Sequence, residues 1–475
     1  MRYVSTRGEA ASLGFADVLL TGLAPDGGLF VPETWPELAP LDELRGLSYP
    51  ELAVEVMWPF VEAPDVGSTG EPEITREDFS RMVHDSYTDF DSPEICPVRP
   101  LGDLWLLELF HGPTLAFKDV ALQLVGRLFD HVLTARGSSV TILGATSGDT
   151  GSAAMDAFSG LSRAQCVILF PDGRTSDIQR RQMTTIAAPN CHAVAVDGTF
   201  DDCQDLVKAA FGDEEFRTEV GLSAVNSINW GRVMAQVVYY VSAHLEVSPE
   251  GTEVDFCVPT GNFGNVLAGW VAKRMGLPIR RLVVASNRND ILTRTINDGD
   301  MSTNEVVPTT SPSMDIQVSS NFERLLFEVL GRDGSAVSAM LGEFRGDGSV
   351  TVPSEILDRI RADFDAGRLS DDGAADVIER MHEDHGVLLD PHSAVGVGVA
   401  ERILARTPDG ATPMVCLATA HPAKFPDAVF AASGVRPTLP AKLGDLLELP
   451  EHFDHVPDDL DRVEELVRRV LAVRD

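Results

Sequence analysis

The chain has 475 residues, of which 44% are hydrophobic; at about 150 residues per domain it has room for about three domains. Its formal net charge of −35 argues against nucleic acid and anionic membranes as partners. No apolar run is long enough to span a bilayer, and residues 1–7 lack the apolar core of a signal peptide. We therefore expect a soluble cytoplasmic protein.

In chain order, residues 1–95 are predicted to form a small N-terminal domain, in which residues 49–60 have the apolar spacing of a helix. From residue 98 onward, short apolar strands alternate with helical patterns, which predicts βαβ units and parallel sheets. The strands are expected at residues 140–143, 166–170, 192–196, 254–258, 282–285 and 414–417. Because the pattern restarts near residue 254, we expect an α/β fold with two open twisted-sheet lobes and a cleft between them.

The six cysteines indicate free thiols. None of them forms a C-x-x-C pair, and several lie in apolar, strand-like runs, which is typical of buried thiols in a reducing compartment. His382 and His385 look like a polar cluster at a helix end, and no second ligand pair lies near them in the sequence. We therefore expect no metal site.

The stretch HGPTLAFKD at residues 111–119 is a candidate for covalent chemistry. Gly112 and Pro113 set a turn, and a strongly apolar helical pattern follows at residues 120–128. Lys118 thus lies at the head of an apolar helix, where burial lowers the pKa of a lysine and makes it a candidate Schiff-base amine. On these residues alone, a lysine that keeps its charge in solvent at a helix start is the more common structure.

Two loops that follow predicted strands are candidate anion sites. The loop Gly261-Asn262-Phe263-Gly264-Asn265 opens a helix, so its backbone N–H groups can hold a phosphate, and it lacks the lysine of a nucleoside-triphosphate loop. The hydroxyl-rich loop TSGDTG at residues 146–151 suits a carboxylate or phosphate. The alternatives are an ordinary βα turn for the first loop, and helix capping by Ser147 or Asp149 for the second.

Two further stretches place cations beside predicted helices or strands. Thr419 and Lys424 follow the strand at 414–417, at the sheet edge where ligands bind in open α/β folds. Arg232 begins an apolar helix beside two asparagines and a serine in the sequence NSINWGR, which favours an anion site. Incidental loop residues and a surface arginine are the alternatives that these patterns leave open.

Six motifs, taken together, resemble the longer type of threonine synthase. They are HGPTLAFKD, ATSGDTGSAA, NSINWGR, PTGNFGN, PSMDIQVSSNFERLLFE and TAHPAKFP, and the resemblance covers nearly the whole chain. Gly231 stands where the family pattern suggests alanine. The resemblance implies pyridoxal 5′-phosphate as the cofactor and the tryptophan-synthase-β-like fold, called fold type II.

The resemblance also implies a domain division and a role for each site residue. A large cofactor-binding domain would comprise residues 96–127 and 226–475, and a small mobile domain residues 128–225. Lys118 would be the catalytic Schiff-base lysine, and Lys118 and its neighbour Phe117 would both bind the cofactor. The loop at 261–265 would hold the cofactor phosphate, and Thr419 would bond the pyridine nitrogen. The expected substrate-binding residues are Thr146, Ser147, Asp149, Thr150, Gly151, Asn229, Arg232 and Lys424.

The implied activity is that of a carbon–oxygen lyase acting on phosphate. It converts O-phospho-L-homoserine and water into L-threonine and phosphate in threonine biosynthesis, with Arg232 and Lys424 as candidate cations for the substrate phosphate. A related phospho-lyase that gives 2-oxobutyrate and a non-catalytic cofactor-binding protein are alternatives; the intact Lys118 and phosphate loop argue against the second. We expect a monomer or homodimer with a small-molecule substrate, and neither nucleic acid nor a membrane as partner.

Overall fold

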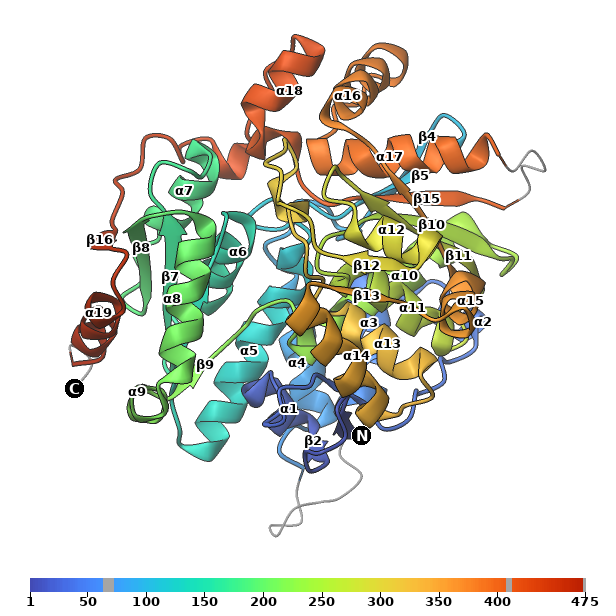
Figure 1. Cartoon of the computed structure of the whole chain (residues 1–475). Coiled ribbons are helices and arrows are strands. Elements are labelled where there is room, and N and C mark those ends of the chain that lie inside the picture. The colour runs from blue at the N-terminus through green and yellow to red at the C-terminus, as the bar shows by residue number, and fades with distance from the viewer. Residues whose placement is uncertain (63–71, 407–411, 473–475) are drawn as a thin grey trace.

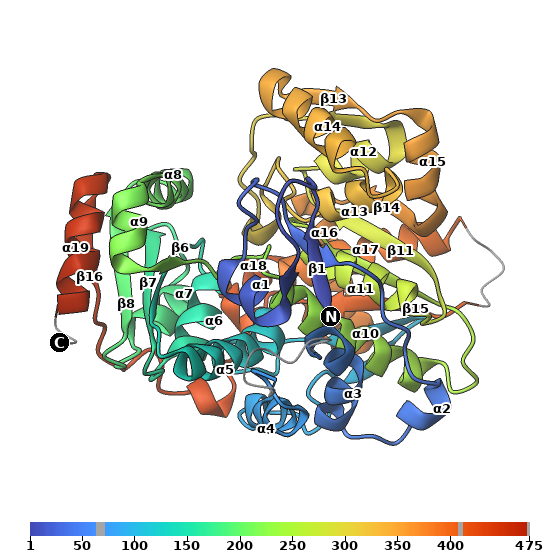
Figure 2. The same ribbon diagram turned by 90° about the horizontal axis from the view of Figure 1, so that it is seen from below.

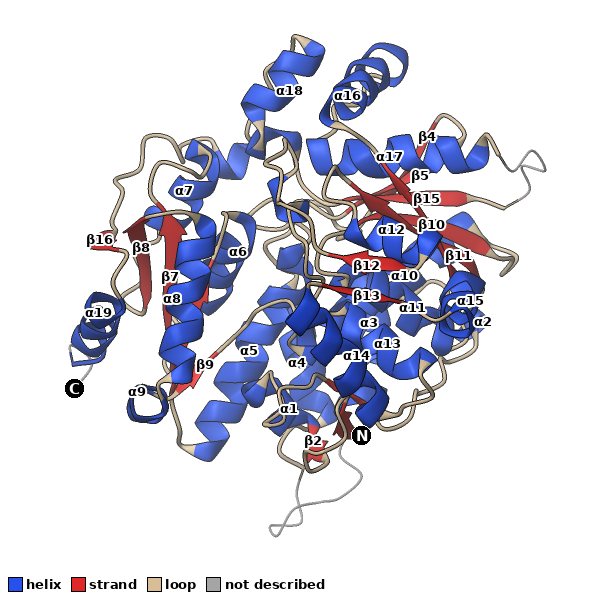
Figure 3. Ribbon diagram, in the orientation of Figure 1, coloured by secondary structure: helices blue, strands red, loops and turns tan. Residues whose placement is uncertain are grey.

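The computed structural model describes residues 1–62, 72–406 and 412–472. It has two α/β lobes, each built on its own sheet, as Figure 1 and Figure 3 show. The predicted α/β class with two sheet lobes is therefore confirmed. Residues 63–71, 407–411 and 473–475, which belong to the predicted N-terminal and large domains, lie outside the described residues.

The N-terminal segment packs against the larger lobe. Its sheet is antiparallel, in the order β2-β1-β3. The rings of Tyr3 and Phe60 lie 5.8 and 5.7 Å from that of Trp230, which begins α10 (Trp230–Val247), so the segment shares a core with the larger lobe. Its helix α3 lies beside α10 in Figure 2. The elements of the segment are β1 (Arg2–Ser5), β2 (Leu13–Gly14), α1 (Phe15–Thr21), β3 (Phe30–Pro32), α2 (Leu41–Leu44), α3 (Tyr49–Val61) and α4 (Arg76–Ser86).

The larger lobe contains a six-stranded sheet in the order β14-β11-β10-β15-β5-β4. All neighbours are parallel except the β4–β5 pair. Side chains alternate between the two faces: Leu282 and Val284 of β11 join one hydrophobic core, and Val283 and Ala285 join another. The strands are β4 (Val98–Leu101), β5 (Leu104–Glu108), β10 (Val254–Pro259), β11 (Ile279–Ser286), β14 (Phe364–Arg368) and β15 (Met414–Ala418).

Helices cover both faces of this sheet. Residues of α10 and α11 lie in the first core, and residues of α16 and α17 in the second. Between α11 and α16 the chain adds a small two-stranded sheet and four more helices. These elements and those after β15 are α11 (Gly264–Arg274), α12 (Ile291–Asp298), β12 (Asp300–Ser302), η1 (Pro312–Met314), α13 (Phe322–Val329), α14 (Gly334–Asp347), β13 (Ser349–Thr351), α15 (Ser354–Asp363), α16 (Asp371–His385), α17 (Pro391–Leu404), η2 (Pro422–Lys424), α18 (Pro426–Ser433) and η3 (Ala441–Leu443).

The smaller lobe has a five-stranded parallel sheet in the order β16-β8-β7-β6-β9. Every residue of β7, AQCVILFP, is buried, as expected for a strand covered on both faces. The helix α5 (Lys118–Arg136) packs against α6 here and against α10 of the larger lobe, so it connects the two. The elements are β6 (Val140–Ala145), α6 (Asp149–Phe158), β7 (Ala164–Pro171), α7 (Asp177–Thr184), β8 (Cys191–Asp197), α8 (Phe200–Gly212), α9 (Glu214–Val220), β9 (Leu222–Ser223), β16 (Asp454–Pro457) and α19 (Leu460–Ala472).

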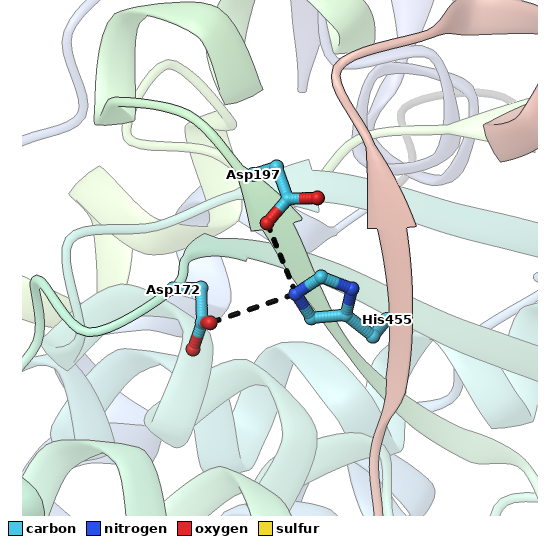
Figure 4. A group of neighbouring side chains, drawn as sticks. All are labelled: Asp172, Asp197 and His455. Atoms are coloured by element: carbon cyan, nitrogen blue, oxygen red, sulfur yellow. Dashed lines mark ion pairs between the residues drawn. The ribbon is translucent and has the colours of Figure 1, made fainter.

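The C-terminal elements differ from the predicted domain division, which assigned all of residues 226–475 to the large domain. Instead, β16 pairs with β8, and α19 packs on α8 and α9 of the smaller lobe. His455 Nε2 lies 3.2 Å from Asp197 and 3.5 Å from Asp172, at the ends of neighbouring strands (Figure 4). The sequence of this four-residue polar strand does not indicate that it pairs with a strand more than 250 residues earlier. The predicted domain division therefore placed β16 and α19 in the wrong lobe.

All six cysteines are free and buried, as predicted. Of the helices in the described part of the chain, none combines the length and apolar character needed to cross a membrane.

Candidate active site

The turn before α5 places Lys118 at the carboxyl end of the larger sheet. Leu115 has a φ of 62°, so the chain bends sharply there. The bend is bonded to the loop after β15: Phe117 N donates to Thr419 O at 2.9 Å, and His421 N donates to Leu115 O at 3.0 Å. Two of the predicted site regions, around Lys118 and around Thr419, are therefore neighbours.

The Lys118 amine is buried, which rules out the solvent-facing alternative. Burial lowers the pKa of Lys118, the carboxylate of Asp149 opposes this shift, and the charges of Lys424 and Arg232 add to it. The Nζ atom lies 3.3 Å from Asp149 Oδ2 and 4.7 Å from the centre of the Phe117 ring. A buried amine with a lowered pKa suits nucleophilic and proton-transfer chemistry near neutral pH.

Asp149 joins the charged groups of the site. Its Oδ2 accepts from Lys118 Nζ and, at 3.2 Å, from Ser313 Oγ. Its Oδ1 accepts from Gln179 Nε2 at 2.9 Å and lies 3.1 Å from Lys424 Nζ. Burial alone would raise the pKa of Asp149, but the charges of Lys424 and Lys118 hold it well below its ordinary value. This carboxylate binds two ammonium groups and is therefore unsuited to the predicted contact with a substrate carboxylate.

Lys424 is fully buried, and all three of its protons have acceptors. Its Nζ donates to Thr114 O at 2.7 Å and to Gln182 Oε1 at 2.9 Å, and it forms the ion pair with Asp149. An ammonium group has only three donors. In this arrangement Lys424 has no donor left for a substrate phosphate, in contrast to its predicted role.

The loop at 146–151 is shaped by its own first residue. Thr146 Oγ1 accepts from the N–H groups of Gly148 and Gly151 at 2.9 and 2.8 Å, so this hydroxyl fixes the loop. Ser147 and Thr150 are only partly buried and flank the start of α6. Their hydroxyls and the first N–H groups of the helix are the parts of this loop that suit an anion.

The loop at 261–265 has the shape predicted for a phosphate cradle. Phe263, with a φ of 62°, reverses the chain just before α11 begins at Gly264. A Cβ atom on Gly264 would lie 3.3 Å from Asn321 Nδ2, and one on Gly261 would lie 2.8 Å from Ser313 O, so both positions are crowded. The first N–H groups of α11 have no acceptors within their helix, so this turn suits an anion.

Arg232 is buried in the first turn of α10, and no carboxylate in the described part of the chain pairs with it. Its Nη1 donates to Val225 O at 3.1 Å, and among the described residues its Nε has no acceptor and its guanidinium no ion pair. Burial lowers its pKa to about 10, and Tyr239 opposes the shift. The side chain of Asn229, by contrast, is already hydrogen-bonded within the protein. Its Oδ1 accepts from Gly231 N at 3.0 Å, and its Nδ2 donates to Leu19 O at 2.8 Å.

The residues around Lys118 fit a cofactor that carries an aldehyde, a pyridine ring and a phosphate. Lys118 would hold the aldehyde, and Thr419 would face the ring nitrogen. The turn at 261–265 would hold the phosphate, close to Asn265, whose buried Nδ2 has no acceptor in the described structure. A buried donor without an acceptor is costly and points to a missing ligand.

Several residues that complete the site were not predicted. Ser313 and Gln179 bind Asp149, and Gln182 binds Lys424. His392 Nε2 accepts from Ser313 N at 3.2 Å while its Nδ1 lies 2.8 Å from Asp390. Ser313 lies in the PSMD motif noted above, whereas the two glutamines lie in an ordinary helical segment that gives no local signal.

The fold and site define a class of protein. A buried lysine at the head of a helix, between two α/β lobes that also carry a helix-start turn suited to a phosphate, is the arrangement expected of pyridoxal-phosphate-dependent enzymes of fold type II. The family model "Pyridoxal-phosphate dependent enzyme" matches residues 96–341, and the chain belongs to that family.

The particular family follows from two further family models, one relative and two crystal structures. The models "Threonine synthase N terminus" and "Threonine synthase, C-terminal" match residues 2–87 and 393–467. The chain is 48% identical over 472 residues to the threonine synthase of Pseudomonas aeruginosa, covering 98% of each chain. It resembles the crystal structures of PLP-bound threonine synthase from Brucella melitensis (52% identity, TM-score 0.93) and of the yeast enzyme (38%, 0.92), each with 99% of both chains covered. The chain therefore belongs to the threonine synthase family, which confirms the predicted family and cofactor.

We predict that reduction of the holoenzyme with borohydride fixes the cofactor on Lys118. The reason is the burial of this amine and its lowered pKa. Peptide mapping after reduction is the measurement, and Lys118→Ala should show no label. Recovery of the label on Lys208, Lys273 or Lys424 would contradict the assignment.

We predict that Gly264→Val lowers the affinity for pyridoxal phosphate at least tenfold, because the side chain would press against Asn321 and displace the turn. Titration of the apo-protein with cofactor, followed by fluorescence, measures the change, and circular dichroism checks the fold. Gly342→Val is the control, since that helical glycine faces open space and should keep wild-type affinity. Unchanged affinity in a folded Gly264→Val variant would show that the cradle lies elsewhere.

Proposed function

We propose that the chain converts O-phospho-L-homoserine and water into L-threonine and inorganic phosphate, as a cytoplasmic monomer or homodimer in threonine biosynthesis. The observation that carries the substrate assignment is Arg232, a buried guanidinium with no anionic partner in the described structure, whose charge acts on Lys118. Placing a phosphate dianion beside it would satisfy a cation that otherwise stays buried and unpaired.

Lys118 is the proposed acid–base group of the reaction. Pyridoxal phosphate, when bound, draws electrons from the substrate and so acidifies the protons on Cα and Cβ. Lys118 Nζ takes up these two protons in turn; one is given to Cγ, which becomes the methyl group after phosphate leaves, and one is returned to Cα at the end. The added water supplies the hydroxyl on Cβ, and its remaining proton is taken by the released phosphate. Its lowered pKa makes the neutral amine available, and Asp149 accepts a hydrogen bond from it and keeps it in place.

Arg232, Ser147 and Thr150 are proposed for the anionic groups of the substrate. Arg232 donates to the phosphate, which leaves from Cγ. The two hydroxyls and the start of α6 bind the substrate carboxylate. The water that adds at Cβ must enter a site in which Lys118, Asp149 and Lys424 are all buried, so access is controlled by the smaller lobe, which carries Asp149.

Product analysis tests this proposal directly. Holoenzyme mixed with O-phospho-L-homoserine should release threonine and phosphate in equal amounts, and Lys118→Ala should release neither. Equal amounts of 2-oxobutyrate, ammonia and phosphate would identify a phospho-lyase instead. Tight cofactor binding without any product would identify a non-catalytic protein.

We predict that Arg232→Lys lowers kcat/KM for O-phospho-L-homoserine by roughly ten- to a hundredfold, since a charge-assisted hydrogen bond contributes about 1.5–3 kcal/mol. Inhibition by inorganic phosphate should weaken in parallel, while cofactor absorbance and the pH profile stay nearly unchanged because the charge is kept. Steady-state kinetics with phosphate as inhibitor provide the measurement. Full activity with full phosphate sensitivity would place the phosphate elsewhere.

Lys424→Met should act differently, through the pH profile. The charge of Lys424 lowers the pKa of Lys118, so its removal raises that pKa. A base with a raised pKa is deprotonated only at higher pH, and the acidic limb of the kcat/KM profile should therefore move to higher pH. Sensitivity to phosphate should persist, because the donors of Lys424 are already engaged. An unmoved profile combined with lost phosphate inhibition would instead support the direct phosphate contact expected from the sequence.

A further inference from the structure

Arg324 on α13 is a fully buried cation that the reaction does not use. Its Nε donates to Phe30 O at 2.9 Å, its Nη2 to Ile228 O at 2.6 Å, and its Nη1 to Asn321 Oδ1. Burial lowers its pKa to about 9, with Glu323 opposing the shift. Its three acceptors come from three separate segments: β3, the loop before α10, and the residue that precedes α13.

Asn321 connects this arginine to the phosphate turn. Its Nδ2 donates to Asn262 O at 3.0 Å and to Ser227 O at 3.1 Å, and its backbone N donates to Asn262 O at 3.1 Å. Because Arg324 holds Oδ1, the amide of Asn321 has one orientation, with its donors toward Asn262. Without Arg324, the Asn321 amide could rotate, and its Nδ2 would no longer be held toward Asn262.

The phosphate turn needs support of this kind. Phe263 is not a glycine, yet it adopts a φ of 62°, a conformation that side chains disfavour. Its ring packs against Phe322 at 5.2 Å and Phe364 at 5.5 Å, so Phe322 of α13 and the Asn321 just before it hold the same turn. The direction of the first N–H groups of α11 depends on this turn.

We propose that Arg324 is a positioning residue for the cofactor-phosphate turn: through Asn321 it fixes the carbonyl of Asn262 and so aims the N–H groups at the start of α11. The proposal rests on the assignment of residues 261–265 to the cofactor phosphate. Because Arg324 also bonds Phe30, this one side chain would couple the docking of the N-terminal segment to the binding of the cofactor phosphate.

Cofactor titration of Arg324→Lys is the test. Lysine keeps the charge but cannot bond three acceptors in a planar fork. The apo-protein, made from holoenzyme, is titrated with pyridoxal phosphate and, separately, with pyridoxal, which lacks the phosphate. We expect the dissociation constant for pyridoxal phosphate to rise about tenfold or more and that for pyridoxal to change less than twofold. Equal losses for both ligands would mean a general structural role and would overturn the proposal.

Arg332→Lys is the matched control. Arg332 donates to the carbonyls of Glu33 and Pro32, so it holds the same N-terminal segment without any contact to Asn321. It should leave both affinities unchanged. A loss of pyridoxal phosphate affinity equal to that of Arg324→Lys would assign the effect to N-terminal docking alone and would also overturn the proposal.

Asn321→Ala provides the second variant, which also decides the case if Arg324→Lys does not fold. It should show the same phosphate-specific loss, and the double variant should be no weaker than Asn321→Ala, since the two residues act in series. Additive losses, or unchanged affinity in Asn321→Ala, would refute the connection. Gly264→Val distinguishes the positioning role from the phosphate assignment on which it rests. Unchanged cofactor affinity in Gly264→Val would refute the assignment of the phosphate to this turn. Reduced affinity in Gly264→Val, with unchanged affinity in the Arg324 and Asn321 variants, would refute only the positioning role.

Discussion

The site depends on one buried carboxylate shared by two buried lysines. Lys118 and Lys424 cannot both stay charged away from water without a nearby anion, and Asp149 supplies it at 3.3 and 3.1 Å. Lys118 begins α5 and Lys424 ends η2, both at the carboxyl edge of the larger sheet, whereas Asp149 begins α6 of the smaller lobe. The ion pairs therefore join the two lobes at the proposed catalytic lysine, and a displacement of the smaller lobe would change the charge around Lys118.

The scaffold brings these groups together through sheet geometry. Parallel strands place all their following loops on one edge, so the loops after β10 and β15 and the start of α5 converge although up to 300 residues separate them. The N-terminal segment then supports this edge from outside: Asn229 bonds Leu19, and Arg324 bonds Phe30. This is why the segment shares the core of the larger lobe.

Local features of the site could be predicted from the sequence, and its long-range contacts could not. Lys118 at a helix head, the turn at 261–265 and the hydroxyl-rich loop at 146–151 each depend on neighbouring residues, and each has the expected local structure. The family resemblance implies a substrate-binding role for Asp149, and only the fold reveals that two lysines face it. The pairing of β16 with β8 likewise joins segments that share no local signal.

The acidity of the chain does not oppose the binding of an anionic substrate, because the relevant charges act over different distances. The net charge of −35 lies mostly on exposed side chains, whose fields are screened beyond about 8 Å at physiological ionic strength. Around the site, Lys118, Lys424 and Arg232 are buried together with the carboxyl groups of Asp149 and Asp119, so these groups interact in a region of low dielectric constant. Buried charges interact more strongly than screened surface charges. We therefore expect the buried cations near the site, rather than the total charge of the chain, to govern the proposed binding of the substrate phosphate, while the acidic surface favours solubility.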